Sequence, residues 1–314
     1  MAKKRRKVRD GTKEEGQGPK IMAADLISKL PDHVIHHILS FLPTIYAVRM
    51  SLLSRCWRRM WYSIPALKFD DHQIKEELFF NFVEQCLKHR QMGMQGNTTS
   101  VIARFELRIS DYRVDSFQVD RWLSFAARPH LKELIVNAGG MYCMSGFYCL
   151  PQFALDLTSL TILNLKFMKL EDISHVNLPS LKSMSFSYVD VEAKVLHNLI
   201  LRCPSLESCF IEDDEDNETV LPSNLQISRF PLLESLTFKG CHQVDIRHQY
   251  LKVLVLEKRV DWVEEVKSEI SIDAPNLVCF SYNSSELLQI VMNSPNLLET
   301  NITLYEFEET CSME

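Results

Sequence analysis

The stretch LPDHVIHHILSFLPTIYAVRMSLLSRCWRRMW, residues 30–61, determines how the rest of the chain is organised. It predicts three short helices. Pro31 suits the first helical position, because its missing N–H would have no partner there. Four apolar residues of the first helix recur at helical spacing and form one stripe: Ile35, Ile38, Leu39 and Leu42.

Two further helices follow the first. Pro43 ends the first helix, and we expect Thr44 to cap the second. One side of the second helix carries Ala47, Val48, Ser51 and Leu52. We expect Ser54 to cap the third helix, in which Trp57 and Trp61 lie one turn apart. So short a segment cannot bury three apolar faces by itself, so the remaining apolar surface needs a partner.

Order, spacing and residue type in this stretch also form a motif. Its parts are Leu30-Pro31-Asp32, the run 38–43, Ala47-Val48-Arg49, Leu53-Ser54-Arg55 and the Trp57/Trp61 pair. Together they resemble the F-box of plant F-box/leucine-rich-repeat proteins. The resemblance implies that this segment binds the Skp-type adaptor and, through it, the cullin and RING subunits of a ubiquitin ligase. The rest of the chain would then capture a protein substrate.

The resemblance also implies which residues contact the adaptor: Leu30, Pro31, Ile35, Ile38, Leu39, Leu42, Pro43, Val48, Leu52, Trp57 and Trp61. His33 and Tyr46 stand where the family is expected to carry an acidic residue, which predicts weaker charge complementarity to the adaptor. A small helical cap on the next domain is the alternative interpretation. It explains the apolar stripe but not the ordered motif.

Length and composition restrict the class of protein. The 314 residues are long enough to bury a sizeable core, and 46% hydrophobic with 24% charged residues is ordinary for a globular protein. A formal net charge of −6 argues against nucleic-acid binding, and no apolar run is long enough to span a bilayer. The nine cysteines form no CxxC pair, which predicts buried thiols in a reducing compartment.

Residues 1–24 have little apolar content and are predicted to be a disordered basic tail. The tail contains five consecutive basic residues: Lys3, Lys4, Arg5, Arg6 and Lys7. Such clusters serve as nuclear import signals, and this one resembles the short monopartite type. We therefore expect the chain in the nucleus, with the cytoplasm as a second compartment. A solvated charged tail and nonspecific nucleic-acid contact are the alternatives.

The F-box is predicted over residues 25–65, and residues 66–100 are predicted to be a linking helix and loop. Residues 73–88 show helical periodicity, which predicts a helix that couples the F-box rigidly to the next domain. Its expected apolar side carries Ile74, Leu78, Phe82, Cys86 and Leu87.

From Val101 the period changes. Phe105, Leu107 and Ile109 alternate as in a strand, and Asp115 is expected to cap a following helix. An L-x-x-L-x-L unit or a close variant then recurs: 131/134/136, 160/163/165, 181/184/186, 206/209/211, 233/236/238, 251/254/256, 277/280/282 and 297/300/302.

This recurrence is typical of leucine-rich repeats, in which each unit buries its apolar face only by stacking on its neighbours. The predicted fold is therefore α/β: a three-helix F-box, then an irregular leucine-rich-repeat solenoid over residues 101–314, a horseshoe with a parallel sheet. An unrelated α/β domain is the alternative. Helices or irregular turns are expected on the outer face, the best being the helix over residues 191–201.

Strand periodicity assigns the repeat residues to two faces. Leu163 and Leu254 should be buried, and the residues between the leucines should point to the concave face. We predict that the concave residues bind the protein substrate: Asn164, Lys166, Ser185, Ser187, Thr237, Lys239, Val255 and Glu257. The acidic run 212–218 is expected to be a solvated linker, with a contact to a basic substrate as the alternative.

The sequence carries no motif typical of enzymatic chemistry. The sequence contains no nucleophile elbow, zinc-protease pair or phosphate-binding loop. Cys241, His242 and His248 are expected in a turn rather than around a metal, so no cofactor or metal is predicted. The leading hypothesis is a non-catalytic substrate receptor. A repeat scaffold or nuclear binding protein without a ligase role is the second, and a hydrolase on an unrecognised fold is the third.

One departure from the family lies at the end of the chain. Relatives of this architecture often continue past the repeats, whereas this sequence stops at Glu314. We therefore expect either uncapped last repeats or reduced substrate recognition.

Overall fold

The structure is a computed structural model. It describes residues 30–52, 54–93, 101–110, 115–139, 147–171, 173, 175–212, 230–240, 244–257, 269–284 and 289–305.

The three predicted F-box helices are confirmed. They are α1 (Asp32–Phe41), α2 (Thr44–Met50) and α3 (Arg55–Trp61). Ser54 caps α3 as expected, because its side chain accepts a hydrogen bond from the Trp57 N–H at 3.3 Å. The prediction that Thr44 caps α2 is wrong: Pro43 holds the N-cap position. Thr44 is buried, and its Oγ1 accepts a hydrogen bond from the Lys68 N–H at 2.8 Å.

The segment predicted to be a linker belongs to the repeat domain. Residues 66–93 form β1 (Ala66–Asp70), the 3₁₀ turn η2 (Asp71–Gln73) and α4 (Glu76–Gly93). Strand β1 pairs in parallel with β2 (Arg104–Ile109), so the sheet begins at Ala66 and not at Val101. The helix is confirmed, but its buried face was misassigned at Leu78, which is exposed, whereas Phe79 is fully buried.

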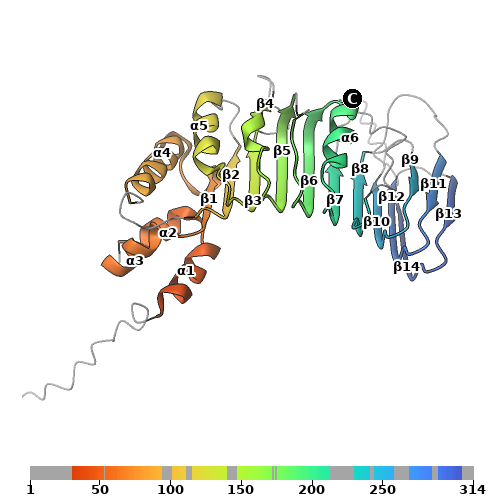
Figure 1. The fold of residues 1–314 in the computed structure, drawn as a ribbon, viewed down its shortest axis with the longest axis horizontal. Coiled ribbons are helices and arrows are strands. Elements are labelled where there is room, and N and C mark those ends of the chain that lie inside the picture. The colour runs from red at the N-terminus through yellow and green to blue at the C-terminus, as the bar shows by residue number, and fades with distance from the viewer. Residues whose placement is uncertain are drawn as a thin grey trace, which may run out of the picture.

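All eight predicted repeat strands are present, and all pair in parallel. They are β3 (Glu133–Ala138), β5 (Ile162–Leu170), β6 (Ser183–Val191), β7 (Ser208–Glu212), β8 (Ser235–Lys239), β10 (Val253–Glu257), β12 (Cys279–Ser284) and β14 (Glu299–Leu304). The sheet runs in the order β1-β2-β3-β5-β6-β7-β8-β10-β12-β14, with β4 (Tyr148–Cys149) pairing with β5. Figure 1 shows these strands side by side, with α1–α3 at the β1 end.

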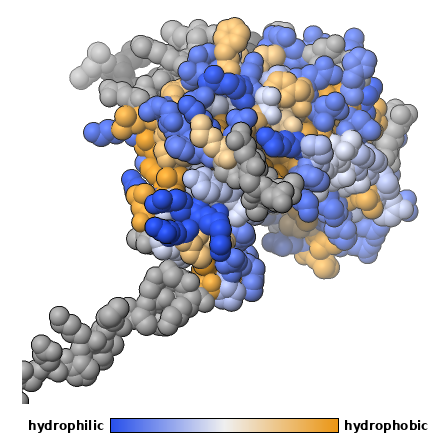
Figure 2. Space-filling view, turned by 60° about the vertical axis from the view of Figure 1, so that its left-hand side comes forward, coloured by the Kyte–Doolittle hydropathy of each residue, from blue (hydrophilic) through white to orange (hydrophobic). Residues whose placement is uncertain are grey.

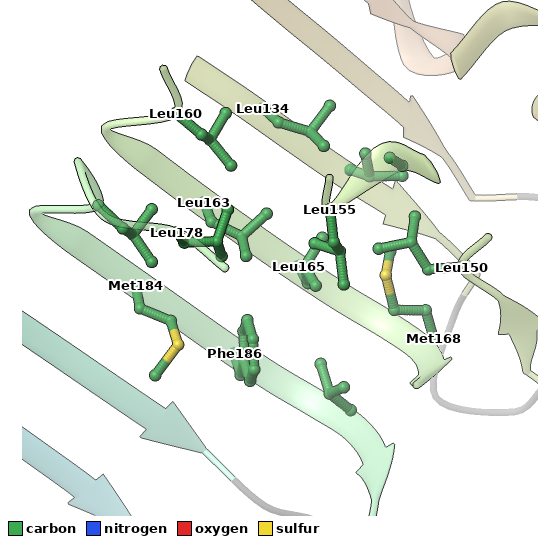
Figure 3. Close-up of a cluster of buried hydrophobic side chains, with 14 of the residues drawn as sticks. Leu134, Leu150, Leu155, Leu160, Leu163, Leu165, Met168, Leu178, Met184 and Phe186 are labelled. Carbon is green, nitrogen blue, oxygen red and sulfur yellow. The ribbon is translucent and has the colours of Figure 1, made fainter. Parts of the chain in front are cut away.

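The register aligns the repeat leucines across the sheet. Leu134, Leu163 and Met184 are direct partners on β3, β5 and β6, and Leu236, Leu254 and Phe280 continue the row on β8, β10 and β12. Leu163 and Leu254 are fully buried, as predicted. Figure 3 shows Leu134, Leu163, Met184 and Phe186 among the side chains of one core. Stacking of units therefore makes the core continuous.

The elements behind the sheet differ between its two halves. In the first half, α5 (Ser116–Ala126) and α6 (Ala193–Leu201) add side chains to the core, and Asp115 and the segment 191–201 behave as predicted. The 3₁₀ turn η3 (Gln152–Ala154) lies between them in sequence.

In the second half, the expectation of helices or irregular turns is wrong. A second parallel sheet of β13 (Gln289–Asn293), β11 (Glu269–Asp273) and β9 (Val244–Arg247) lies there (Figure 1). Ile246, Ile270 and Ile272 of these strands join the core. These isoleucines alternate with polar residues, which is the period of a strand and not of a helix. The alternation explains why strands lie behind this half of the sheet where helices or irregular turns were expected.

The last repeat unit forms a strand but buries little. Ile302 of β14 is 54% exposed, and Leu298 just before the strand is 85% exposed. Within the described residues no further strand follows β14, and none of them covers these apolar side chains as a next stacked unit would. No helix in the described part of the chain is both long and apolar enough to cross a membrane.

Candidate functional site

The structure divides the predicted adaptor-binding residues into two groups. Ile35, Leu39, Trp57 and Trp61 lie in the core of the chain itself, at most 4% exposed. These four side chains help to pack α1 and α3 against each other, and their prediction as adaptor contacts stays a prediction. The isoleucine and leucine side chains and the two indole rings are needed to build the F-box, because three short helices have few other residues with which to form a core.

The second group reaches the surface. Ile38 is 38% exposed and Leu52 is 74% exposed. Pro31 is also exposed, and the other members are half-buried: Leu30, Leu42, Pro43 and Val48. These seven residues remain available to a partner. Figure 2 turns the helical end of the molecule forward, where orange apolar residues lie among blue hydrophilic ones.

Two further exposed apolar residues were missed. Phe41 is 67% exposed, and Tyr46 is 45% exposed beside the guanidinium of Arg49, which lies 5.4 Å from the ring centroid. Phe41 lies three positions after Ile38, on a face of α1 that the search for a buried stripe passes over. We call Ile38, Phe41, Tyr46 and Leu52 the apolar F-box patch.

A buried arginine holds the F-box to the repeats. Arg90 of α4 is fully buried and donates hydrogen bonds to the carbonyls of Trp61 (3.4 Å) and Ile64. Trp61 is the last residue of α3 and Ile64 follows it, so Arg90 supplies donors at the C-terminal end of the helix, where carbonyls lack intrahelical partners. Desolvation, with the nearby charge of Arg128, lowers the pKa of Arg90 to about 10, so the guanidinium stays charged at neutral pH.

Sequence reasoning missed Arg90, although a signal was present. Phe79, Val83 and Leu87 form the buried stripe of α4, and Arg90 continues it at helical spacing. A charged residue on an apolar stripe indicates a buried, paired charge. Together with the Thr44–Lys68 hydrogen bond, Arg90 joins the F-box helices to the first strand of the sheet.

The second candidate surface is the sheet face opposite the core, which we call the open face. Of the eight predicted substrate-binding residues, Ser187 is buried and the other seven are half-buried. The register collects them into two groups. Asn164 pairs with Ser185 and Lys166 with Ser187 on β5 and β6. On β8 and β10, Thr237 pairs with Val255 and Lys239 with Glu257.

Strand β7 lies between the two groups and supplies residues that were not predicted. Phe210 is the partner of Ser185 on one side and Thr237 on the other, and Glu212 stands between Ser187 and Lys239. In the sequence, Phe210 and Glu212 alternate with the apolar Cys209 and Ile211, and this alternation could have placed them on the open face. The eight predicted residues and these two therefore form one continuous surface over four repeat strands and β7.

Charges on either side of β5 and β6 are paired. Lys239 Nζ of β8 lies 3.2 Å from Glu257 Oε2 and 3.8 Å from Glu212 Oε1. Toward the other edge of the sheet, Arg104 of β2 pairs with Glu133 at 2.8 Å and with Glu106 at 3.0 Å. Half-buried networks of this kind fix side chains in place.

The centre of the open face carries an aromatic pair. The rings of Phe167 and Tyr188 stack with their centroids 4.9 Å apart and their planes at 7°. Lys166 Nζ lies 4.9 Å from the Phe167 centroid and 5.4 Å from that of Tyr188. Sequence reasoning missed this pair. The apolar spacing 163, 165, 168, 170 changes from two to three, which indicates a bulge after Lys166.

Side chains that could hold a metal ion lie at the end of β1. Ligand atoms of Asp70, Asp71 and His72 lie within 4.8 Å of one another. The Asp71 carboxylate already accepts hydrogen bonds from the backbone N–H and hydroxyl of Ser110, and Asp70 accepts one from the His72 N–H. The group therefore closes the turn between β1 and α4, and the prediction of no metal stays a prediction.

The imidazole of His248 also has a structural role. Its Nε2 donates to the Phe230 carbonyl at 2.8 Å, and its Nδ1 accepts from the Tyr250 N–H at 3.2 Å. Desolvation lowers the pKa of His248, so the imidazole is neutral, as these roles require. Several predicted residues lie outside the described residues: the basic cluster 3–7, the acidic run after Glu212, Cys241 and His242.

Comparison with known proteins agrees with this architecture. A sequence profile of the F-box domain matches residues 27–68. A second profile, described as "FBD-associated F-box protein At5g56370, LRR repeats", matches residues 119–297. A three-helix F-box followed by a leucine-rich-repeat solenoid places the chain among the F-box/LRR proteins.

Full-length relatives extend the match. The chain is 30% identical over 285 residues to the FBD-associated F-box protein At5g22720 of Arabidopsis thaliana, covering 90% of this chain and 55% of that protein. It is 27% identical over 294 residues to the F-box/FBD/LRR-repeat protein At4g00160 of the same plant, covering 92% and 59%. The chain belongs to the F-box/LRR-repeat family, and it spans little more than half the length of these relatives.

Proposed function

We propose that the chain is the substrate-recognition subunit of a Skp–cullin–F-box ubiquitin ligase, with no catalytic step of its own. The F-box would bind the Skp-type adaptor and, through it, the cullin and RING subunits. The open face of the repeats would bind a target protein. Such a receptor works by raising the effective concentration of the target near the ubiquitin-carrying enzyme.

The observation that supports the proposal most is the apolar F-box patch. Phe41 and Leu52 expose 67% and 74% of their surface on a helical unit whose core is otherwise well buried. Large apolar side chains exposed on one small helical unit are candidates for a protein–protein interaction site. The patch lies on the segment that matches the F-box profile.

The rigid connection between the F-box and the sheet gives the proposal a mechanism. Arg90 and Thr44 join the two parts through buried hydrogen bonds to Trp61 and Lys68. A target held on the open face would therefore keep a fixed position relative to the adaptor. In this arrangement the receptor positions a lysine of the target, and the chemistry belongs to the other subunits.

Assembly of the full chain with a purified Skp-type adaptor and a cullin fragment tests this function. We expect the three proteins to elute together from a gel-filtration column, with the receptor present in equal amount to the adaptor. If the chain elutes alone at micromolar concentration, it is a leucine-rich-repeat scaffold or nuclear binding protein without a ligase role.

We also propose that the chain acts in the nucleus. The support is the basic cluster Lys3, Lys4, Arg5, Arg6 and Lys7 in the sequence. Replacing Lys4, Arg5 and Arg6 with alanine should move a fluorescent fusion of the chain from the nucleus to the cytoplasm. Persistent nuclear enrichment would show that the cluster does not direct import.

A further inference from the structure

Two aromatic rings at the centre of the open face are buried outside the hydrophobic core. Phe167 and Tyr188 are 8% and 6% exposed, yet neither belongs to the continuous core cluster. The adjoining Leu165 and Met168 do belong to it, and Figure 3 shows both beside Leu150 and Leu155. The rings therefore lie outside the continuous core that joins the repeats. We call Lys166, Phe167 and Tyr188 the Lys166 platform.

The backbone at both rings is strained. Phe167 has φ 52° and Tyr188 has φ 54°, in the left-handed region that bulky side chains rarely adopt. Neither residue has a partner in the pairing of β5 with β6. The register goes from the Lys166–Ser187 pair directly to the Met168–Val189 pair. The corresponding position two residues after Phe238 of β8 is Gly240, which directly follows the strand and has φ 91°.

Glycine adopts this backbone conformation without strain, as Gly240 does. Two neighbouring repeats instead hold an aromatic residue in it. Strained residues of this kind persist where a binding or catalytic site requires them. The stacked rings therefore indicate a binding function at the centre of the open face, since the core does not require them.

The charge of Lys166 distinguishes it from the other cations of this face. Its neighbours in the same row are Asn137 on β3 and Ser187 on β6, both uncharged. Lys239, in the same row, pairs with carboxylates on both sides. Within the described part of the chain Lys166 forms no ion pair, and its ammonium group instead lies over the two rings. It is a positioned cation that a ligand can neutralise.

An acceptor beside Lys166 also lacks a partner. The Asn137 side-chain oxygen is buried and receives no hydrogen bond from the described residues. Buried polar groups without a partner are uncommon and call for an explanation. A ligand that supplies both an N–H donor and a negative charge would satisfy Asn137 and Lys166 together. An extended peptide with an acidic side chain has both groups.

We propose that the Lys166 platform binds the carboxylate of an aspartate or glutamate in an extended segment of the target protein. This inference rests on the proposed function and specifies the class of its substrate. The single charge of Lys166 matches one carboxylate. A phosphate carries close to two negative charges and is usually read by several arginines, whereas the nearest arginine of this row, Arg108, is already paired with Glu106 at 2.8 Å.

Peptide binding by the full chain tests the proposal. The probes are three pools of short fluorescein-labelled peptides with degenerate flanks and a central Glu, Gln or phosphoserine. We expect fluorescence anisotropy to show roughly tenfold tighter binding of the Glu pool than of the Gln pool, the size of one charge-assisted contact. Lys166→Gln should abolish this preference, and Lys166→Arg should retain it.

The matched control is Lys169→Gln. Lys169 lies on the same strand, is half-exposed and pairs with Glu171 at 3.3 Å, so its loss should leave the preference within twofold of wild type. Thermal unfolding of each variant shows whether it is folded. An absent Glu preference in the wild type, or an unchanged one in Lys166→Gln, overturns the proposal. Tightest binding of the phosphoserine pool overturns it in favour of a phosphorylated target.

Adaptor binding, measured on the same preparations, separates this inference from the proposed function. If the adaptor binds and no Glu preference is found, the platform assignment is wrong and the receptor function stands. If the Glu preference is present and the adaptor does not bind, the platform stands and the ligase role is wrong.

Discussion

The two ends of the molecule both expose apolar side chains, but for different reasons. At the F-box end, Phe41 of α1 and Leu52, in the turn after α2, lie above the buried core of the F-box. At the other end, Leu298 and Ile302 are exposed because no further strand follows β14 within the described residues. The exposed F-box residues lie on the surface above a buried core. The exposed residues at β14 belong to the row of core residues, and within the described residues no further strand covers them.

This difference shows that exposure alone does not identify a binding site. In a solenoid, the last unit exposes its stacking face as a consequence of the architecture. An exposed patch indicates function more strongly when the elements that carry it are fixed from below. Arg90 and Thr44 fix the F-box in this way.

The largest expected effect concerns stacking within the repeats. Leu254→Ala, in a fully buried position, should lower the free energy of unfolding by roughly 2–5 kcal/mol, because a cavity adds to the lost transfer energy. Ile302→Ala on the exposed strand β14 should change it by less than about 1 kcal/mol. Urea unfolding of both variants measures this. Equal losses would mean that the β14 end is packed against something and that the comparison is mistaken.

The second effect concerns the buried arginine. Arg90→Met should destabilise the chain by roughly 2–4 kcal/mol, because the Trp61 and Ile64 carbonyls lose the buried hydrogen bonds that the guanidinium donates. Lys88→Met on the exposed side of α4 is the control and should stay within about 0.5 kcal/mol of wild type. Should Arg90→Met unfold at the wild-type urea concentration, the F-box is not held by this contact.

Several features of both ends follow from the sequence alone. The repeat leucines place Leu163 and Leu254 in the core because a two-residue period leaves one face for burial. Ser54 is predictable as a cap because it precedes the apolar turn containing Trp57. Local patterns of this kind determine an element without reference to the rest of the chain.

Other features depend on contacts between distant residues. Thr44 has the composition of a cap, but the tertiary contact with Lys68 uses its hydroxyl instead. At the platform, the stacking of Phe167 on Tyr188 requires two bulges in register, which no single repeat specifies. Hydrophobicity alone could not show that Phe41 is exposed at the surface and not buried in the core. Sequence periodicity therefore predicts the core better than the candidate sites.

The third prediction isolates the Thr44 contact. Thr44→Val keeps the shape of the side chain but removes the acceptor of the Lys68 N–H, which should cost about 1 kcal/mol of unfolding free energy. The same change at exposed Thr300 on β14 should have almost no effect. Equal values at the two sites, measured by thermal unfolding, would contradict the asymmetry between the ends.

The fourth and smallest effect concerns His248, in the half of the molecule where β9, β11 and β13 lie behind the main sheet. Burial lowers the pKa of this imidazole in the folded state, whereas the unfolded chain has the ordinary value of about 6.5. The stabilisation is therefore present above pH about 6.5 and is lost as the pH falls through the folded pKa. His248→Gln should flatten this pH dependence in urea unfolding between about pH 8 and pH 5. An unchanged slope would show that His248 does not titrate with unfolding.

Affinity for the Skp-type adaptor tests the central claim most directly. Calorimetric titration should show that Phe41→Ala combined with Leu52→Ala weakens binding by roughly 2 kcal/mol or more, about thirtyfold, at an unchanged unfolding temperature. Phe117→Ala, at an 83% exposed position on α5 away from the F-box, should bind like wild type. An unaltered affinity of the double variant, or an equal loss in Phe117→Ala, would contradict the account.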